Sequence, residues 1–501
     1  MDLLYGFLTL FSDPMSLVYI VVAAIVGVVV GATPGLTTAA AIAMLVPITF
    51  YVDPLYALAG LYVIGKAGRF GGSIAAILFN TPGTAAAAAT TLDGNAMSRK
   101  GMPGKALKTA AISSAIGDLV GDALLIFGAI WISQLTKNFG PPEYFAVYLA
   151  AFLVISTVIG SSIVKGFIST GAGIVVAMIG LDPMDGAPRL DFGLLDLQSG
   201  LSLVPLLIGM FVLSEVAIQI ENTKRSGGTG RIVADTVPGG DRLTLPELRR
   251  ILPIIGRSSL LGSVIGILPG LGSSVAAFAA YGTERGRSKI KDQWGSGIIE
   301  GIAAPESANN AVSGPSMIPL LALGVPGSTI AAILLGVFLI HGIPVGPQIF
   351  DTSGELVYAL FASGILGIAI YFLIGFYGST FVGAAIARVP TRLIYPWIFL
   401  TCFISAYAAR ANVFDVYVMC FAGLFGYLMR KGGYSVAAFI IAFVLAPGAE
   451  QAFRQSIILS NDGWMIFFQR PVAVAFFLIA AIAVLAGAFK QLRARRSNQL
   501  T

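Results

Sequence analysis

The sequence predicts an all-α polytopic membrane protein made of two inverted-topology repeats, with broken helices or re-entrant hairpins at Pro-Gly motifs. The chain is 56% hydrophobic and 11% charged, with a mean hydropathy of +0.86, so most of its length must lie in lipid or in protein within lipid. Pairs of Pro-Gly motifs recur in the same order in the two halves. The loops between apolar segments carry opposite charge in the two halves. These three observations together predict the fold class.

The first Pro-Gly break runs from Gly31 to Thr38, and its counterpart at 266–274 lies 235 positions later (269 − 34). The second break, Asn80–Thr84, recurs 244 positions later (326 − 82) at 324–329. Proline removes a backbone donor, and the hydroxyl residues behind it can cap a new helix. Lipid cannot satisfy the freed backbone groups, so each break must face protein or a water-filled cavity, where a substrate could bind. The alternative is that these are kinks in ordinary spanning helices.

Half-helices that begin at the breaks would present free N–H groups and positive dipole ends to a carboxylate. The expected starts are Thr37, Thr84, Ser273 and Ser328. The substrate-binding residues predicted at the four breaks are Thr33, Pro34, Gly35, Thr37, Thr38, Asn80, Pro82, Gly83, Thr84, Pro269, Gly270, Gly272, Ser273, Ser274, Pro326, Gly327 and Ser328.

Four segments are predicted along the chain. Residues 1–220 form the first transmembrane repeat, 221–250 a cytoplasmic linker, 251–490 the second repeat, and 491–501 a basic cytoplasmic tail. Thr37–Phe50 would form a helix of about 21 Å, too short for a hydrocarbon core of about 30 Å, so it is expected to be half of a broken helix. Spanning helices are expected near Leu107–Ile130, Tyr144–Ile159, Gly166–Ile179 and Leu201–Ile220.

The charge of equivalent loops predicts opposite insertion of the two repeats. The loop Asp93–Lys108 has four basic residues and is assigned to the cytoplasm, whereas its second-half equivalent, Gly342–Glu355, has two acids and no Lys or Arg. A reversed bias of this kind is expected of inverted-topology repeats, which place their broken helices at a shared site near the midplane.

Four charged residues interrupt the apolar sequence of the first half. Lys66 and Arg69, at i, i+3 spacing, would share one helix face, and at least one is expected to meet a substrate carboxylate. The alternative is an anchor that extends to the membrane interface. Asp118 and Asp122 have no obvious partner in the sequence, and would either bind an ion or face a hydroxyl group on a neighbouring helix.

The segment 304–311 of the second half contains Glu306, Ser307, Asn309 and Asn310 in otherwise small, apolar sequence. A carboxylate and two amides are costly to bury, and they supply oxygen ligands for Na⁺ or a carboxylate for H⁺. The alternative is a polar helix cap near the interface. No cofactor is expected, and the basic residues are explained by membrane topology, so a nucleic-acid partner is excluded.

Several of these segments resemble the large membrane subunit of the tripartite tricarboxylate transporters: 31–38, 80–84, Asp93-Gly94, 266–274, 305–311 and 323–328. The resemblance implies a bacterial inner-membrane carrier that imports carboxylate anions, driven by an ion gradient. It also implies two partners, a small four-helix membrane subunit and a periplasmic solute-binding protein. Members of this family carry citrate, other carboxylates or aromatic acids, so the resemblance leaves the substrate open. Asp118 and Asp122 lie outside the family pattern.

The predicted function is therefore secondary active transport of a carboxylate by alternating access around the four breaks. Two other classes stay open at this point. An intramembrane transferase acting on a lipid-linked substrate would need an acid-base or metal cluster, and the sequence offers none above chance. An anion channel differs from a carrier only in lacking coupling to an ion gradient.

Overall fold

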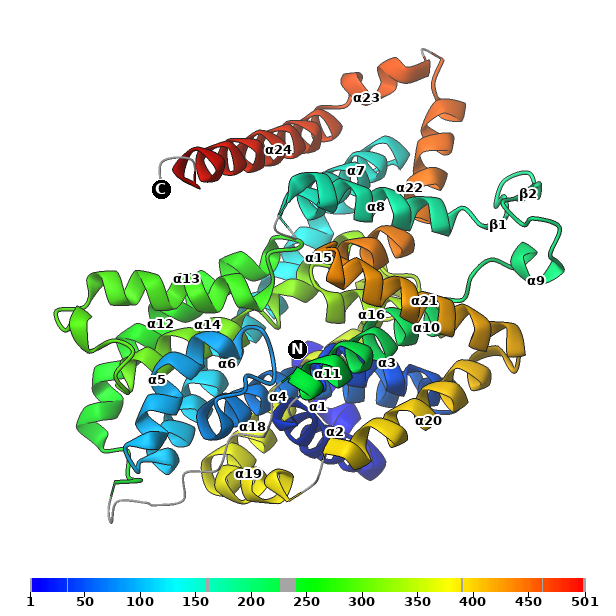
Figure 1. The fold of residues 1–501 in the computed structure, drawn as a ribbon. Helices are drawn as coiled ribbons and strands as arrows, with labels where there is room; N and C mark the ends of the chain where they lie inside the picture. The colour runs from blue at the N-terminus through cyan, green and yellow to red at the C-terminus, as the bar shows by residue number, and fades with distance from the viewer. Residues whose placement is uncertain are drawn as a thin grey trace.

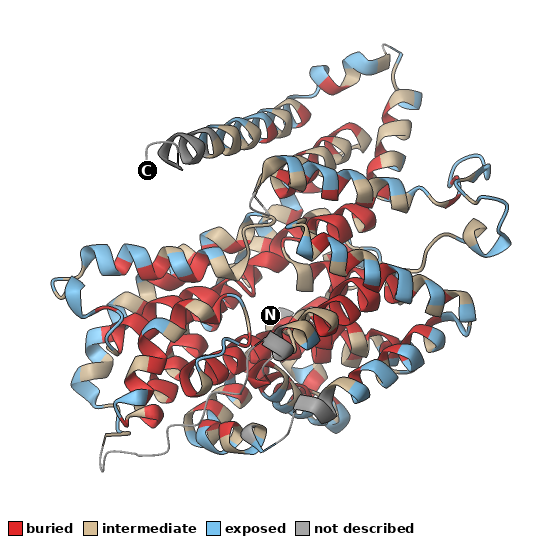
Figure 2. Ribbon diagram, in the orientation of Figure 1, coloured by how far each residue is buried: buried red, intermediate tan, exposed pale blue. Residues whose placement is uncertain are grey.

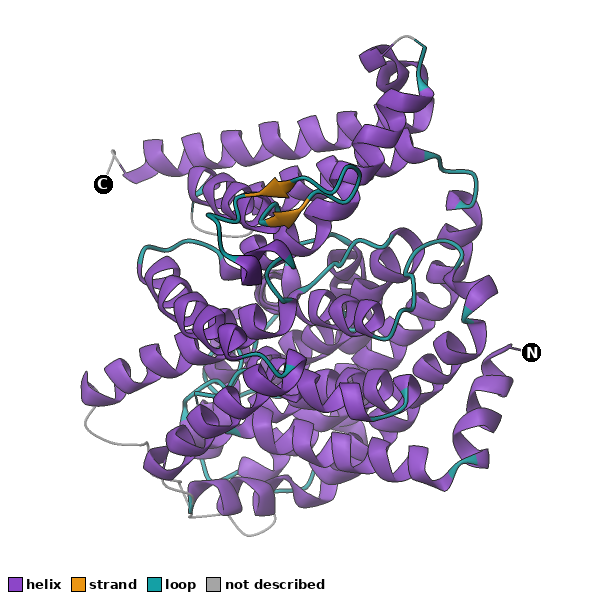
Figure 3. Ribbon diagram, turned by 90° about the vertical axis from the view of Figure 1, so that its right-hand side faces the viewer, coloured by secondary structure: helices purple, strands orange, loops and turns teal. Residues whose placement is uncertain are grey.

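The computed structural model describes residues 2–33, 35–158, 162–225, 240–388, 391–461 and 463–498. Figure 3 shows helices throughout and one small hairpin, in which β1 (Gly180–Leu181) pairs antiparallel with β2 (Pro188–Arg189). Eight helices of this part of the chain are long and apolar enough to cross a membrane. The prediction of an all-helical, polytopic membrane protein is confirmed.

The first half of the chain contains long helices joined by short helical turns, as Figure 1 shows. Its helical elements are α1 (Asp2–Ser12), α2 (Pro14–Ala32), α3 (Thr38–Leu45), η1 (Val46–Tyr51), α4 (Pro54–Phe79), α5 (Ala87–Arg99), α6 (Pro103–Thr136), α7 (Pro141–Val158), α8 (Ile163–Ala177), α9 (Leu195–Gln198), α10 (Leu203–Leu207), the π-helical turn η2 (Ile208–Leu213) and α11 (Ser214–Arg225).

The second half begins with three helices that surround a break and ends with four long helices. Its elements are α12 (Leu245–Ile267), α13 (Gly272–Arg287), η3 (Lys291–Gln293), α14 (Glu300–Ala311), η4 (Pro315–Met317), α15 (Ile318–Leu323), α16 (Thr329–Ile340), α17 (Ile349–Thr352), α18 (Gly354–Leu373), η5 (Ile374–Gly378), α19 (Ser379–Ala387), α20 (Thr391–Arg410), α21 (Val413–Lys431), α22 (Val436–Leu459), η6 (Gly463–Met465), α23 (Ile466–Gln469) and α24 (Pro471–Asn498).

Local sequence explains where the helices begin. The side chain of Asp13 accepts the backbone N–H groups of Met15 and Ser16 at the start of α2, and Asp53 accepts that of Leu55 at the start of α4. In both helices a proline follows the capping aspartate, where its missing donor costs nothing. The helix α2 then ends at the first Pro-Gly break.

Equivalent positions of the two halves make equivalent contacts. A side chain on Gly31 would overlap the backbone of Gly68, and one on Gly266 would overlap the backbone of Val312. Gly31 and Gly266 are 235 positions apart (266 − 31), like the first breaks, and Gly68 and Val312 are 244 positions apart (312 − 68), like the second breaks. Gly35 and Gly270 both have φ of +86°. The residues that end α4 and α15, Asn80 and Gly324, are both left-handed, with φ of 55° and 72°.

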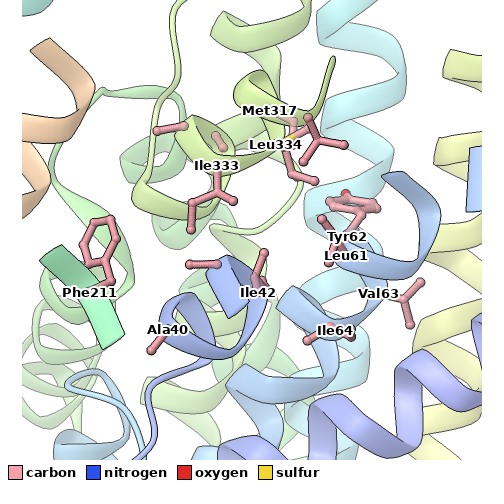
Figure 4. Close-up of a cluster of buried hydrophobic side chains, with 14 of the residues drawn as sticks. Ala40, Ile42, Leu61, Tyr62, Val63, Ile64, Phe211, Met317, Ile333 and Leu334 are labelled. Carbon is pink, nitrogen blue, oxygen red and sulfur yellow. The ribbon is translucent and has the colours of Figure 1, made fainter. Parts of the chain in front are cut away.

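The helices α3 and α16, which follow breaks in different halves, meet in the centre of the molecule. Figure 4 shows Ile42 of α3, Ile64 of α4, Phe211 of η2 and Ile333 of α16 in one buried cluster. Buried residues are concentrated in this region and in α4, α6 and α14, as Figure 2 shows. The structure therefore encloses the segments around the breaks, while longer helices such as α24 lie at the periphery (Figure 1).

Two charged residues of the loop that precedes α10 form a closed network with two charged residues of α22. Asp182 pairs with Arg189 and Arg454, and both arginines also pair with Glu450 of α22. The backbone N–H of Met184, aided by the two arginines, holds the pKa of Asp182 below its ordinary value. The network fixes the hairpin to α22.

One expected boundary is wrong: residues 93–99 belong to α5 and not to a loop, because the helix that follows the second break continues to Arg99. The segment 221–250 predicted as a linker includes the end of α11, which continues to Arg225, and the start of α12 at Leu245. Residues 226–239 of that linker, and 499–501 of the predicted tail, lie outside the described residues.

Candidate functional site

Three helices that begin after Pro-Gly breaks, α3, α5 and α16, converge on the glycine-rich stretch 65–72 of α4. Three of its glycines lie against residues that follow three different breaks: Gly65 against Ile330, Gly68 against Thr38 and Gly72 against Thr84. A methyl group on Gly68 would lie 2.5 Å from Cγ2 of Thr38, so the approach requires glycine. The first turns of α3, α5 and α16 therefore surround one stretch of α4.

Arg69 lies within this stretch and is 7% exposed. Among the residues that the structure describes, none accepts a hydrogen bond from its guanidinium or forms an ion pair with it. Asp118 is the charged residue that acts most strongly on it, from beyond ion-pair distance. A buried cation without a direct partner costs several kcal/mol, so an anion bound here would be stabilised.

Lys66, in contrast, is fully buried and paired with two carboxylates. Its Nζ lies 2.6 Å from Oδ1 of Asp118 and 2.7 Å from Oδ1 of Asp122. The hydroxyl of Tyr371 donates to Oδ2 of Asp118 and that of Tyr62 donates to Oδ1 of Asp122, each at 3.1 Å. We name these five residues the Lys66 cluster.

The Lys66 cluster bears on two interpretations of the sequence. Asp118 and Asp122 accept tyrosine hydroxyls from neighbouring helices, which was one of the two alternatives from sequence. Their ion pairs with Lys66 were not expected, because α4 and α6 are far apart in the chain. The interfacial anchor is wrong for Lys66, since its ammonium group is enclosed between α4, α6 and α18. Whether Lys66 or Arg69 contacts a substrate stays a prediction.

Glu306 is fully buried in α14 and receives three hydroxyl groups from three other helices. Ser73 of α4 donates to Oε1 at 2.6 Å, Thr90 of α5 donates to the same oxygen, and Ser114 of α6 donates to Oε2 at 2.9 Å. The three hydroxyl groups offset part of the cost of burying this carboxyl group. The alternative of a polar cap near the interface is wrong, because all twelve residues of α14 are buried.

The two asparagines of α14 have unused polar atoms. Asn310 donates to Oγ of Ser114 at 2.9 Å and to the carbonyl of Glu306. Among the described residues its Oδ1 has no partner, and neither does Oδ1 or Nδ2 of Asn309. Ser307 bonds only within its own helix, to the carbonyls of Ala303 and Ala304. Buried amide oxygens without partners are rare and suit a cation or an ordered water.

In the first half, the hydroxyl groups at the breaks behave largely as expected. Thr37 caps α3 by accepting the N–H of Ala40 at 3.2 Å, and Thr84 accepts that of Ala87 at 3.3 Å. Thr38 is buried and its Oγ1 has no partner among the described residues. Thr33 instead donates to the preceding turn of α2. Pro34 lies outside the described residues.

The second break of the first half has two exposed residues and one buried residue among those predicted to bind substrate. Asn80 and Pro82 are exposed. Gly83 is buried, donates its N–H to Gly72 at 3.3 Å, and has no room for a side chain because the carbonyl of Gly31 covers it. The two breaks of this half are therefore in direct contact.

The two breaks of the second half also meet, because Gly270 donates its N–H to the carbonyl of Gly327 at 3.2 Å. Ser328 caps α16 as expected, accepting the N–H of Ala331. Ser273 is not a cap: α13 already begins at Gly272, which has φ of +67°. The other predicted residues here are Pro269 and Ser274, which are half-buried, and Pro326, which is buried.

The sequence interpretation missed the hydroxyl groups that surround Glu306 and the glycines that let the helices converge. Ser73, Thr90 and Ser114 come from three separate helices, and single Ser and Thr residues are too common to single out. A signal for the second feature was present: glycines at 65, 68, 71 and 72 alternate with two cations in an otherwise apolar helix. That combination is expected where helices approach closely around a polar site.

The described residues contain no group of three His, Cys, Asp or Glu side chains that could hold a metal ion. A monovalent cation bound among them would therefore depend mainly on amide, hydroxyl and backbone oxygens, with two carboxylates at most. The unused oxygens of Asn309 and Asn310 near Glu306 fit that description.

Comparisons with known proteins agree over most of the chain. A family model described as the tripartite tricarboxylate transporter TctA family matches residues 17–441. An Agrobacterium vitis protein, described as an uncharacterized 52.8 kDa protein in the TAR-I ttuC′ 3′ region, is 33% identical over 500 residues, which cover 99% of this chain and 98% of that protein. An uncharacterized protein in the TAR-II ttuC′ 3′ region of the same organism is 32% identical over 239 residues, covering 47% of this chain and 98% of that protein.

Proposed function

The chain belongs to the tripartite tricarboxylate transporter TctA family, and from that premise we propose that it imports a carboxylate anion by ion-coupled alternating access. It is a multi-pass membrane protein of a transporter family and not an enzyme. The intramembrane transferase is thereby excluded. A tripartite family implies partner subunits, and we assign them as a small four-helix membrane subunit and a periplasmic solute-binding protein in the bacterial inner membrane.

One observation carries the proposal: Arg69 is a buried cation without a direct partner, at the point where three restarted helices converge on α4. Its guanidinium can form two parallel hydrogen bonds with a carboxylate. Free N–H groups in the first turns of α3 and α16 add positive potential. We therefore place a substrate carboxylate at Arg69, and the uptake kinetics of Arg69 variants test this assignment.

The coupling ion is assigned to the polar face of α14. Glu306 supplies a buried carboxylate, and Asn309 and Asn310 supply amide oxygens without partners. Ser307, which bonds to its own helix, would contribute only after a change of rotamer. Na⁺ and H⁺ are both compatible with this set of oxygens. The proposed coupling-ion site is on α14, whereas Arg69 is on α4, so the anion and the coupling ion would bind at separate places. The coupling-ion site faces α4 through the hydrogen bond from Ser73 to Glu306.

We also propose that the two halves are inverted repeats. The matched contacts of Gly31 and Gly266, the equal φ of Gly35 and Gly270, and the left-handed ends of α4 and α15 support a duplicated unit. The reversed charge of the loops supports opposite insertion. Two repeats that pack around one site can exchange which side is open, which is what alternating access requires.

The inverted arrangement predicts how single cysteines will react. Both native cysteines, Cys402 and Cys420, are first replaced by serine. A cysteine at Lys100 should then be labelled by a membrane-impermeant maleimide only from the cytoplasm, and one at Asp351 only from outside. Labelling of both positions from the same side would contradict opposite insertion of the repeats.

The breaks themselves predict a second result. Gly270→Leu should abolish uptake while the protein still inserts, because leucine strains a backbone at φ of +86° and disturbs the contact with Gly327. Gly35→Leu should act in the same way. The matched control is Gly256→Leu in α12, where a side chain meets open space. Normal uptake by both break variants would show that the breaks are only kinks.

A further inference from the structure

We propose that Asp122 is a proton-binding residue of this transporter, and that it exchanges a proton as a carboxylate binds to or leaves Arg69. The proposal rests on the proposed function for its link to transport, because it takes Arg69 as the anion site. The proton site itself follows from the Lys66 cluster alone. Its geometry, its charge balance and its surroundings each point to Asp122.

The two oxygens of Asp122 differ in their surroundings. Oδ1 lies 2.7 Å from Nζ of Lys66 and accepts the hydroxyl of Tyr62 at 3.1 Å. Oδ2 has no partner among the described residues, although Asp122 is only 3% exposed. A buried carboxylate oxygen without a donor is costly. A proton on Oδ2 removes the negative charge of the buried carboxylate and leaves both contacts of Oδ1 in place.

The surroundings of Oδ2 fit a proton better than a metal ion. A methyl group on Gly364 of α18 would lie 3.2 Å from this oxygen, so the helix backbone is close. Na⁺ would need several oxygen ligands, and Asp122 supplies one on this side. The ammonium group of Lys66 already occupies the space between the two carboxylates, where a metal would otherwise be held. A second cation there would be repelled.

The ionised cluster carries one excess negative charge, since Lys66 faces two aspartates. Arg69 provides the compensating positive charge, because it follows Lys66 by three residues on the same helix and is also buried. Without a bound anion, the Lys66 cluster and Arg69 together are therefore electrically neutral. Charges in a membrane interior interact over longer distances than in water, because the surroundings screen them poorly.

A carboxylate bound to Arg69 changes this balance. The substrate then neutralises the guanidinium, and the excess negative charge of the cluster is left without compensation. Uptake of one proton by Oδ2 of Asp122 restores neutrality, and its loss to the opposite side would accompany release of the anion. No other bond forms or breaks. Anion and proton would then move together because neither charge is stable in the site alone.

The other charged groups on the packed helices have partners of their own. On α14, Glu306 holds three hydroxyl groups on its two oxygens. The remaining groups are Arg250 and Arg257 of α12, paired with Glu300 and Glu284; Asp93 of α5, bonded to Tyr281; Glu355 of α18, bonded to Thr9; and Tyr371 of α18, bonded to Asp118. Two described carboxylates on these helices have a buried oxygen without a hydrogen-bond partner, Oδ2 of Asp122 and Oε2 of Glu300. Glu300 is at the first residue of α14 and is paired with the exposed Arg250, whereas Asp122 belongs to the fully buried Lys66 cluster.

Infrared difference spectroscopy on the full chain in lipid nanodiscs tests the proton site without any substrate. As the pH falls, the wild type should show the C=O band of a protonated, buried carboxylic acid, and Asp122→Asn should remove it. Glu306→Gln should leave the band in place. Persistence of the band in Asp122→Asn, or its loss only in Glu306→Gln, would overturn the assignment.

The role of Arg69 is tested by the midpoint of the same titration. Arg69→Gln should raise the midpoint by about one pH unit or more, because a missing nearby cation makes the carboxylate bind its proton about tenfold more tightly. An unchanged midpoint would refute the charge balance, even if Asp122→Asn failed to insert. Neither result depends on transport, so failure of the proposed anion site would appear separately, as unaltered uptake kinetics of Arg69→Gln.

Discussion

Replacing Arg69 with glutamine is expected to raise the KM for uptake at least about 30-fold with little change in the amount of inserted protein. Losing one partner of a buried, hydrogen-bonded charge pair costs about 2 kcal/mol or more, and about 1.4 kcal/mol corresponds to a factor of ten. The native guanidinium has no direct partner among the described residues. Removing it therefore breaks no ion pair within the protein, and the protein should still insert. Uptake per inserted molecule, measured over a range of substrate concentrations, gives the result.

The matched control is Lys165→Gln on α8, whose ammonium group donates to the carbonyl of Gly432 away from the site. That variant should keep the wild-type KM. Arg69→Lys should lie between the two, because an ammonium group retains the charge but loses the paired hydrogen bonds. A wild-type KM in Arg69→Gln would remove this residue from the substrate site.

Replacing Lys66 with glutamine is expected to act on folding more than on affinity. The substitution leaves two buried carboxylates without their cation, and breaking a buried ion pair in this way costs about 3–5 kcal/mol. The yield of monodisperse protein extracted from membranes should fall steeply. The triple variant Lys66→Gln, Asp118→Asn, Asp122→Asn should recover most of that yield, because removing all the charges together removes the penalty.

An exposed ion pair serves as the control for this experiment. Lys137 pairs with Asp351, and their side chains are 43% and 58% exposed. Lys137→Gln should leave the yield unchanged, since exposed pairs contribute about 0–1 kcal/mol. If Lys66→Gln inserted normally and showed a higher KM, the lysine would be a substrate contact rather than the centre of the Lys66 cluster.

The local features of the fold could be predicted from sequence because they depend on near neighbours. Proline and hydroxyl residues at Thr37 and Ser328 mark helix starts by their own chemistry, and the structure has caps at both. Ser273 shows the limit of this rule. Glycine at 272 lets the backbone turn one residue earlier, so α13 begins before the serine and needs no hydroxyl cap.

The partners of the buried charges could not be predicted, because they depend on which helices pack together. Lys66 and Asp118 are 52 residues apart, and Glu306 meets Ser73 across 233 residues. The sequence shows that each charge must be compensated, since an isolated charge in a membrane is unstable. It does not show which helix supplies the compensation. For Lys66 the answer is α6, and for Arg69 we propose a substrate carboxylate.

Accumulation of a carboxylate against its gradient tests the proposed function most directly. Cells that express this chain with its two partner subunits are given radiolabelled acids, beginning with citrate, and internal and external concentrations are compared. An ion-coupled carrier should concentrate one acid several-fold, lose that accumulation when the proton and sodium gradients are dissipated, and lose uptake in the Arg69→Gln variant. Uptake that only equilibrates the acid across the membrane, with or without the gradients, would identify a channel and contradict the carrier.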